Sequence, residues 1–196
     1  MRPYRLFVVA ALLFAAPAAA QPPAQSPPPQ EPIILGPPPP PATALEAFVV
    51  PPGEVLMTAF EDLGDVDGVF VEAREMRDPR GRRARGIVVT IAGRQATPEQ
   101  AFIDPDEFAD LLRGFDALLG ITTNPTSQFR NFDLRYSTRG ELVLTASSTR
   151  NRGVLYGVEV GRVLRARRPL DGGEFHRLRT LVEAAQQKLA TLVEGR

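Results

Sequence analysis

The stretch IDPDEF, residues 103–108, carries three carboxylates in six residues and leads into an apolar pattern of helical spacing. Asp104 stands where a side chain can accept a hydrogen bond from the free N–H groups of a helix start. Glu107 follows three residues later, as in a capping box, and Pro105 suits the first helical position. The apolar residues that follow lie on one face of a helix: Phe108, Leu111, Leu112, Phe115, Leu118 and Leu119. We therefore expect a helix whose start is capped by Asp104 and Glu107.

A second stretch, LDGGEF at 170–175, repeats this arrangement, with Asp171 at the cap position and Glu174 three residues later. Another apolar stripe at helical spacing follows it: Phe175, Leu178, Leu181, Val182, Ala185, Leu189 and Leu192. We expect a second helix here. The shared start has two explanations that stay open, because an internal repeat and ordinary capping physics both produce it.

Strands are predicted on both sides of the first helix from short apolar runs, some of them alternating, that turn residues separate. Before the helix, three strands are expected: 67–77, 84–93 and 99–103. Between the two helices, four more are expected: 127–137, 141–148, 153–160 and 162–167. The segment before the first strand is ambiguous, since residues 44–50 fit a short helix or a strand and residues 54–64 fit a short helix.

The order of these elements predicts an α+β fold, in which an antiparallel sheet of about six or seven strands packs against two helices. Short turns between consecutive strands favour an antiparallel meander. Two similar halves, each a sheet followed by a helix, are compatible with the pattern. The order is similar to that of Whirly-type folds, which double a unit of a four-stranded sheet and a helix. The resemblance concerns element order alone, and we take no function from it.

The N-terminus has the three parts of a secretory signal peptide. Arg2 and Arg5 precede an apolar run of 11 residues at 6–16, and Ala-Ala-Ala at 18–20 offers a cleavage site. A membrane anchor would need about 20 apolar residues, so this run is too short to span a bilayer. We expect cleavage at about Ala20, no transmembrane segment in the mature chain, and a periplasmic or extracellular location.

A proline-rich linker is predicted after the signal peptide. Residues 21–42 hold eleven prolines, a composition that favours extended polyproline II and cannot build a packed core. From residue 43 the composition becomes globular, so residues 43–196 are expected to form a single α+β domain. With about 150 residues, this part of the chain is long enough to bury a core.

Composition excludes several kinds of chemistry. The chain has no cysteine, which rules out thiol catalysis and thiolate metal sites. Without Arg2 and Arg5, 21 basic residues face 23 acidic ones, a balance that argues against a dedicated nucleic-acid binder. The one histidine, His176, lies about 100° off the apolar stripe of its predicted helix, a poor position for a catalytic triad or a zinc site. We expect no cofactor.

Two acidic stretches could be taken for metal sites, and both have a better structural explanation. The run DVDG at 65–68 lacks the Asp and Glu that a calcium loop needs at its first and twelfth positions, and it fits a turn before a strand. The carboxylates of 104–107 fit a helix start, where neighbouring side chains point in different directions. We therefore predict no metal site.

An arginine cluster is the one candidate binding site. Five arginines crowd the tip of a predicted hairpin, with Asp78 as the one acid among them: Arg77, Arg80, Arg82, Arg83 and Arg85. Charged tips are commonly solvated and protect sheet edges from pairing. The alternative is contact with an anionic envelope polymer, a lipid headgroup or an acidic protein, because arginine pairs well with carboxylate and phosphate.

The function that fits these observations is an exported, non-catalytic binding or scaffolding module of the bacterial-type cell envelope or the extracellular space. The alternative is a carboxylate-dependent hydrolase acting on an envelope polymer. A deep pocket with two carboxyl groups of raised pKa would favour the hydrolase, whereas shallow surface grooves over a solid core would favour the binding module.

Overall fold

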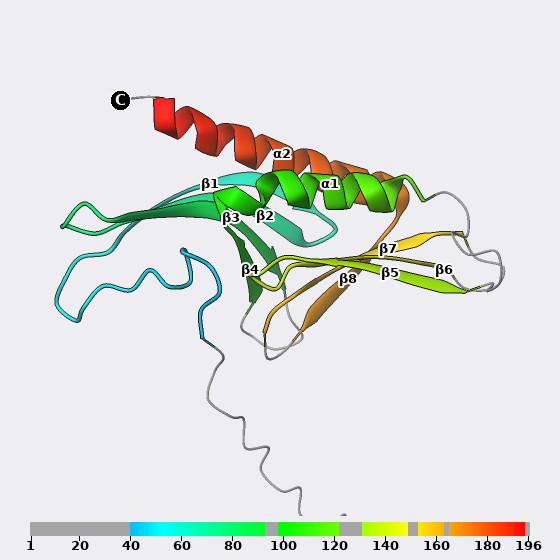
Figure 1. Ribbon diagram of the computed structural model, residues 1–196, viewed down its shortest axis with the longest axis horizontal. Helices are drawn as coiled ribbons and strands as arrows, with labels where there is room; N and C mark the ends of the chain where they lie inside the picture. Colours follow the sequence, from blue (N-terminus) through cyan, green and yellow to red (C-terminus); the bar gives the residue numbers. More distant parts are fainter. Residues whose placement is uncertain (1–39, 93–97, 122–130, 149–152, 163–164, 195–196) are drawn as a thin grey trace, which may run out of the picture. The chain divides into compact units, whose positions relative to one another are not determined.

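The computed structural model describes residues 40–92, 98–121, 131–148, 153–162 and 165–194, and Figure 1 shows their arrangement. The predicted signal peptide and nearly all of the proline-rich linker lie outside these residues. In the described part of the chain, no helix is long and apolar enough to cross a membrane.

The described residues form two four-stranded antiparallel sheets, and each sheet is followed in the chain by a helix. The first half consists of β1 Met57–Val66, β2 Val69–Arg77, β3 Arg83–Ile91 and β4 Glu99–Ile103, then the 3-10 turn η1 Pro105–Glu107 and α1 Phe108–Leu119. The second half consists of β5 Phe132–Ser137, β6 Val143–Ser148, β7 Leu155–Val160, β8 Ala166–Leu170 and α2 Gly172–Glu194. Both sheets are meanders. The predicted α+β class is confirmed, while the predicted count of six or seven strands is wrong, because eight are present among the described residues.

The strand that the sequence did not reveal is β1. Residues 54–64 were left ambiguous, with a short helix as the structure that they fitted, but Met57–Val66 pairs antiparallel with β2, from Met57 opposite Arg77 to Val66 opposite Val69. Residues 57–62 are exposed on both faces of the strand, so they carry no alternation of apolar and polar side chains. A bulge between Asp62 and Gly64 interrupts the register as well.

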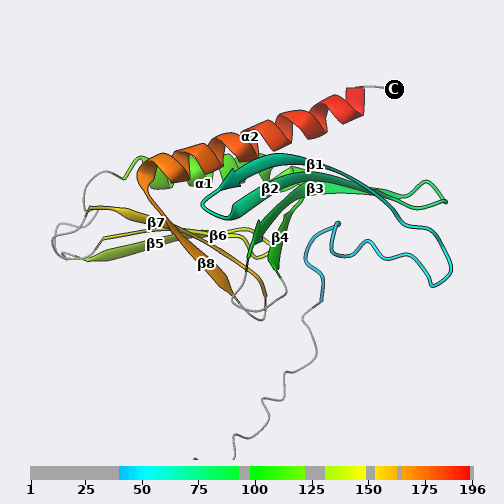
Figure 2. The same cartoon turned by 180° about the vertical axis from the view of Figure 1, so that it is seen from behind.

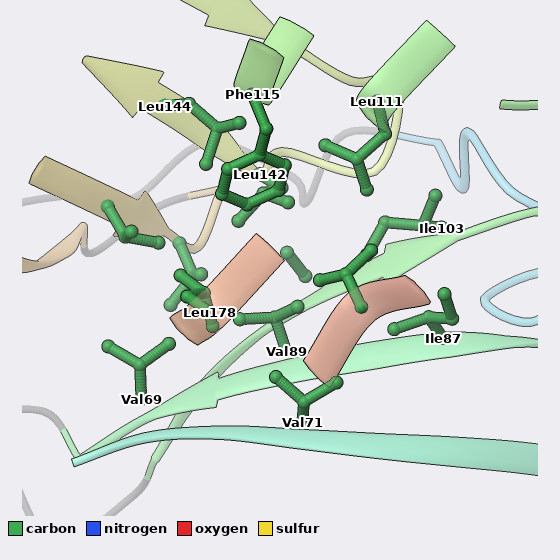
Figure 3. Close-up of a cluster of buried hydrophobic side chains, with 14 of the residues drawn as sticks. Val69, Val71, Ile87, Val89, Ile103, Leu111, Phe115, Leu142, Leu144 and Leu178 are labelled. Carbon is green, nitrogen blue, oxygen red and sulfur yellow. The ribbon is translucent and has the colours of Figure 1, made fainter. Parts of the chain in front are cut away.

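The two halves share one core, to which both sheets and both helices contribute side chains. α2 contacts β1, β2 and β3 of the first sheet, and α1 contacts α2 and β6 of the second sheet (Figures 1 and 2). The cluster in the close-up of Figure 3 includes Val71 and Val89 of the first sheet and Leu144 of the second. The rings of Phe115 in α1 and Phe175 in α2 lie 4.9 Å apart within this cluster. The main core is therefore common to the two sheets.

The capping box predicted for α2 is confirmed. The N–H of Glu174 donates to Oδ1 of Asp171 at 2.7 Å, and the N–H of Asp171 donates to Oε2 of Glu174 at 2.8 Å. At α1 the predicted cap is wrong, although Asp104 does stand at the start of the helical turn. Its carboxylate accepts the N–H of Ala44 instead, at 2.8 and 3.1 Å. Glu107 accepts the N–H of Arg139 at 2.9 Å.

The segment 43–48 covers the face of the first sheet opposite α2. Leu45 is buried against Ala84 and Val88 of β3, with Phe48, Met76 and Phe102 around them. Gly86 makes room for this contact, since a Cβ atom there would lie 2.7 Å from Cδ1 of Leu45. The hydrogen bond from Ala44 to Asp104 fixes the segment in place. The first sheet is thus covered on both faces over the inner part of its strands.

Candidate functional site: the outer end of the first sheet

The hairpin that joins β2 and β3 is closed by a buried carboxylate. Asp78 accepts the N–H of Arg82 at 2.8 Å and its Nε at 2.5 Å. Gly81 adopts a φ of 84° in this turn, a conformation that favours glycine. Burial opposes the ionisation of Asp78, but the hydrogen bonds from Arg82 outweigh it and hold the pKa of this carboxyl below its usual value. The end of the hairpin is therefore a turn stabilised by hydrogen bonds to Asp78, and it positions the arginines around it.

Three of the five arginines that were predicted to bind a partner already form an ion pair with an acidic residue of the same chain. Arg77 pairs with Glu75, Arg80 pairs with Glu54, and Arg82 pairs with Asp78. Asp78 is the one acid within 77–85, but two acids from outside this stretch, Glu75 and Glu54, also pair with its arginines. Glu75 lies two residues before Arg77 on the same face of β2, and Glu54 arrives from the segment that precedes β1. Only the tertiary fold brings Glu54 to this place.

Arg83 and Arg85 differ from the other three, because no described residue forms an ion pair with either. In the ladder of β2 and β3 they stand opposite Arg77 and Glu75. Residues directly opposite in an antiparallel pair share a face. Three arginines and one glutamate therefore lie on the same face of the hairpin, with two more positive than negative charges. We call Arg77, Arg83, Arg85 and Glu75 the arginine face. Nearer the core, residues of β2 and β3 on this same face of the sheet pack against α2.

A groove of about 340 Å³ opens beside the arginine face, between β1, β2 and α2. Its apolar lining comes from four side chains: Met57, Ala59, Phe60 and Ala73. On one side stands the ion pair of Glu61 with Lys188 of α2, at 2.6 Å, and on the other the pair of Glu75 with Arg77. The groove is thus apolar inside and charged at its rim.

The residues of this groove were missed because the sequence left the start of β1 ambiguous, with a short helix as the structure that it fitted. One feature of the sequence could have pointed to them. The run VLMTAF at 55–60 is rich in large apolar residues but lacks both the helical and the strand period. Such a run has no single apolar face, so it argues against the short helix that these residues were thought to fit.

The acidic residues of 104–107 form an ion-pair network rather than a helix cap. Arg139, in the turn between β5 and β6, lies 2.5 Å from Asp106, 3.3 Å from Glu107 and 3.8 Å from Asp104. Partial burial opposes the charge of Arg139, but Glu107 and Asp106 outweigh it and raise the pKa of this guanidinium. Among the described residues, no group of three or more His, Asp or Glu side chains is arranged to hold a metal ion.

No model of a known protein family matches the chain, and no curated protein is similar to it in sequence. The chemistry of the site is therefore argued from its own residues.

Proposed function

We propose that the protein is an exported, non-catalytic binding module that holds an acidic partner at the outer end of the first sheet. The observation that carries this proposal is the arginine face beside the groove. Arg83 and Arg85 have no acidic partner in the described part of the chain, and they lie on the same face as Arg77. Guanidinium groups pair bidentately with carboxylate and phosphate, so a group of either kind fits this place.

The groove adds a second requirement to the partner. Because its lining is mostly apolar, an apolar part of the partner would gain from entering it, while the charged part stays at the rim. An anionic lipid headgroup with its chain, an acidic polymer of the envelope, or an acidic protein segment with an apolar side chain all satisfy this description. The signal peptide would deliver such a module to the envelope, and the linker of 21–42 would precede it as an extended N-terminal segment.

The test is binding to vesicles of anionic phosphatidylglycerol and to isolated envelopes at low salt. An arginine near an anionic membrane contributes about 1 kcal/mol, so Arg83→Ser together with Arg85→Ser should weaken vesicle binding roughly 30-fold. Binding of the unchanged protein should also fall as salt rises, because the screening length shortens to about 8 Å at physiological ionic strength.

A matched control is available on the helices. Arg113 and Arg177 are the more exposed members of their ion pairs, and changing both to Ser alters the net charge by the same amount. This control should bind as the unchanged protein does. Equal loss of binding in the two double variants would mean that net charge, and not the arginine face, decides the interaction, and the proposal would fail.

The hydrolase alternative has less to support it. Its expected mark is a pair of carboxyl groups with raised pKa in one pocket. The two glutamates that line the groove, Glu61 and Glu75, are each held in an ion pair. Among described carboxyl groups, the resolved pKa shifts are those of Asp78 and Asp116, and both are downward. We therefore keep the binding module as the proposal.

A further inference from the structure

The segment that leads into β1 forms a turn with exposed apolar side chains. We call this segment, VVPPGEVL at residues 49–56, the apolar turn. The N–H of Glu54 donates to the carbonyl of Pro51 at 3.1 Å, and Gly53 adopts a φ of 89°, as a tight turn with Pro and Gly at its centre requires. Three large apolar side chains of the turn are exposed: Val49 at 69%, Val55 at 73% and Leu56 at 38%.

Contacts with the hairpin of β2 and β3 hold the apolar turn in place. Arg80 forms an ion pair with Glu54, and a guanidinium N–H of Arg82 donates to the carbonyl of Val49 at 3.2 Å. The turn and the hairpin lie at the same end of the first sheet in both views (Figures 1 and 2). Glu54 is the one charged residue within 49–60, so its pairing with Arg80 neutralises the charge of this stretch.

The arginine face begins where the apolar turn ends. Met57, the residue after the turn, stands opposite Arg77 of β2, and Arg77 stands opposite Arg83 of β3. Glu75 and Arg85 form the next row on this face, two residues nearer the core, or about 7 Å. At this end of the sheet, exposed apolar side chains therefore come first and a net positive charge follows them.

We propose that the outer end of the first sheet docks on an anionic bilayer, with the apolar turn inserted among the lipids and the arginine face on their phosphates. Apolar side chains of peripheral segments enter about 5–10 Å into the headgroup region. Because the arginines follow the turn by a few residues, they would stay among the headgroups. This inference rests on the proposed function, since it identifies the acidic partner as a lipid surface, and it adds the apolar turn to the binding site.

The form of the site favours a bilayer over an acidic protein. The exposed valines stand on a turn at the end of the sheet, and a bilayer admits such side chains without a matching cavity. A protein partner would need a complementary pocket for them. Exposed apolar side chains next to arginines are also typical of segments that lie on membranes, because insertion and attraction to anionic lipids both add to the affinity.

Removing the apolar side chains tests the insertion. Val55→Ser together with Leu56→Ser keeps every charge, and both residues are exposed, so thermal unfolding should show a folded protein. The double variant should bind phosphatidylglycerol vesicles roughly tenfold more weakly than the unchanged protein, because it loses the gain of moving these side chains out of water. The matched control is Phe70→Ser with Leu155→Ser, which removes exposed apolar side chains away from the turn and should leave binding unchanged.

A tryptophan probe reports the insertion directly, because the chain has no tryptophan of its own. Vesicle binding should shift the emission of Val55→Trp to shorter wavelength, and lipids brominated on their acyl chains should quench it. The emission of Leu155→Trp should show neither change. Neutral phosphatidylcholine vesicles should bind both variants weakly, because the arginine face contributes only where the lipids are anionic.

The outcomes separate this inference from the proposed function. The insertion is overturned if Val55→Ser with Leu56→Ser binds vesicles as the unchanged protein does, or if brominated lipids leave the emission of Val55→Trp unquenched. Loss of binding in Arg83→Ser with Arg85→Ser would then still support an acidic partner. If isolated envelopes retain the protein and anionic vesicles do not, the partner is not a lipid surface and only this inference fails. If neither binds, both proposals fail.

Discussion

The carboxylate of Asp104 could cap the helix or hold the N-terminal segment in place. Removing this carboxylate distinguishes the two roles. In the structure this buried carboxylate accepts the N–H of Ala44. A hydrogen bond to a charged group contributes about 1.5–3 kcal/mol, so Asp104→Ala should lower the free energy of unfolding by about that amount. Its contact with Arg139 is long, at 3.8 Å, and the guanidinium is half exposed, so this pair adds little.

A double-mutant cycle with Leu45→Ala makes the distinction sharp. Leu45 is held by the same segment, and a buried Leu→Ala change costs about 2–5 kcal/mol. If Asp104 secures this segment, each single change already frees much of it. The double variant should then lose less stability than the sum of the two, by about 0.5–3 kcal/mol.

Urea unfolding at pH 7 measures all three variants, with Asp171→Ala in the α2 capping box as the control. This control should cost about 0.5–2 kcal/mol and be additive with Leu45→Ala, because it caps a helix and does not touch the segment. If the losses in free energy of unfolding of Asp104→Ala and Leu45→Ala add to within about 0.5 kcal/mol, Asp104 does not hold the N-terminal segment in place.

Three further outcomes are expected. A hydrogen bond from Arg179 is the main cause that lowers the pKa of Asp116. The ionised carboxylate therefore stabilises the fold above the ordinary pKa of about 3.9, and this contribution fades as the pH falls below that value. In urea unfolding, Asp116→Asn should be less stable than the unchanged protein at pH 7, and the difference should shrink toward pH 3. Gly140→Ala should cost at least about 3 kcal/mol, because its Cβ would lie 1.8 Å from a backbone oxygen of β4, whereas Gly153→Ala, with no atom nearby, should be close to neutral in thermal unfolding. Exported protein should begin at Gln21 by intact-mass measurement, and a retained Met1 would contradict signal cleavage.

The elements that the sequence predicted well are those in which burial and periodicity coincide. α2 has its apolar stripe buried from Phe175 to Leu189, and β3 alternates at Ile87, Val89 and Ile91 on its core face. In these two elements the periodic spacing of apolar residues follows from their burial in the core. β1 has no such pattern, because its outer part faces no core on either side, and its assignment as a strand depends on pairing with β2.

The two capping motifs show that neighbouring residues in the sequence are not enough to predict which hydrogen bonds form. IDPDEF and LDGGEF have the same residue types at the same spacing, yet only the second forms a capping box. Asp171 is exposed and has no competing donor among the described residues, whereas Asp104 meets the N–H of Ala44 from 60 residues away. The same holds for the arginines of the hairpin: Asp78 was visible as a neighbour in sequence, and Glu54 was not. Partners that are distant in sequence decided the outcome in both cases.

The difference in strand length between the two halves supports the proposal that the outer end of the first sheet is the binding part. Strands β5 to β8 have five or six residues each, and this length is enough to cover the shared core. β1, β2 and β3 have nine or ten residues, so they continue for about three residues, or roughly 10 Å, beyond what the core requires. That extension carries the arginine face, the groove and the open edge of β1. Its part in β1 exposes Met57 and Phe60 to water, and folding does not bury these two side chains. The proposed binding surface would account for this exposure, because a partner would cover the exposed apolar area and the unpaired arginines.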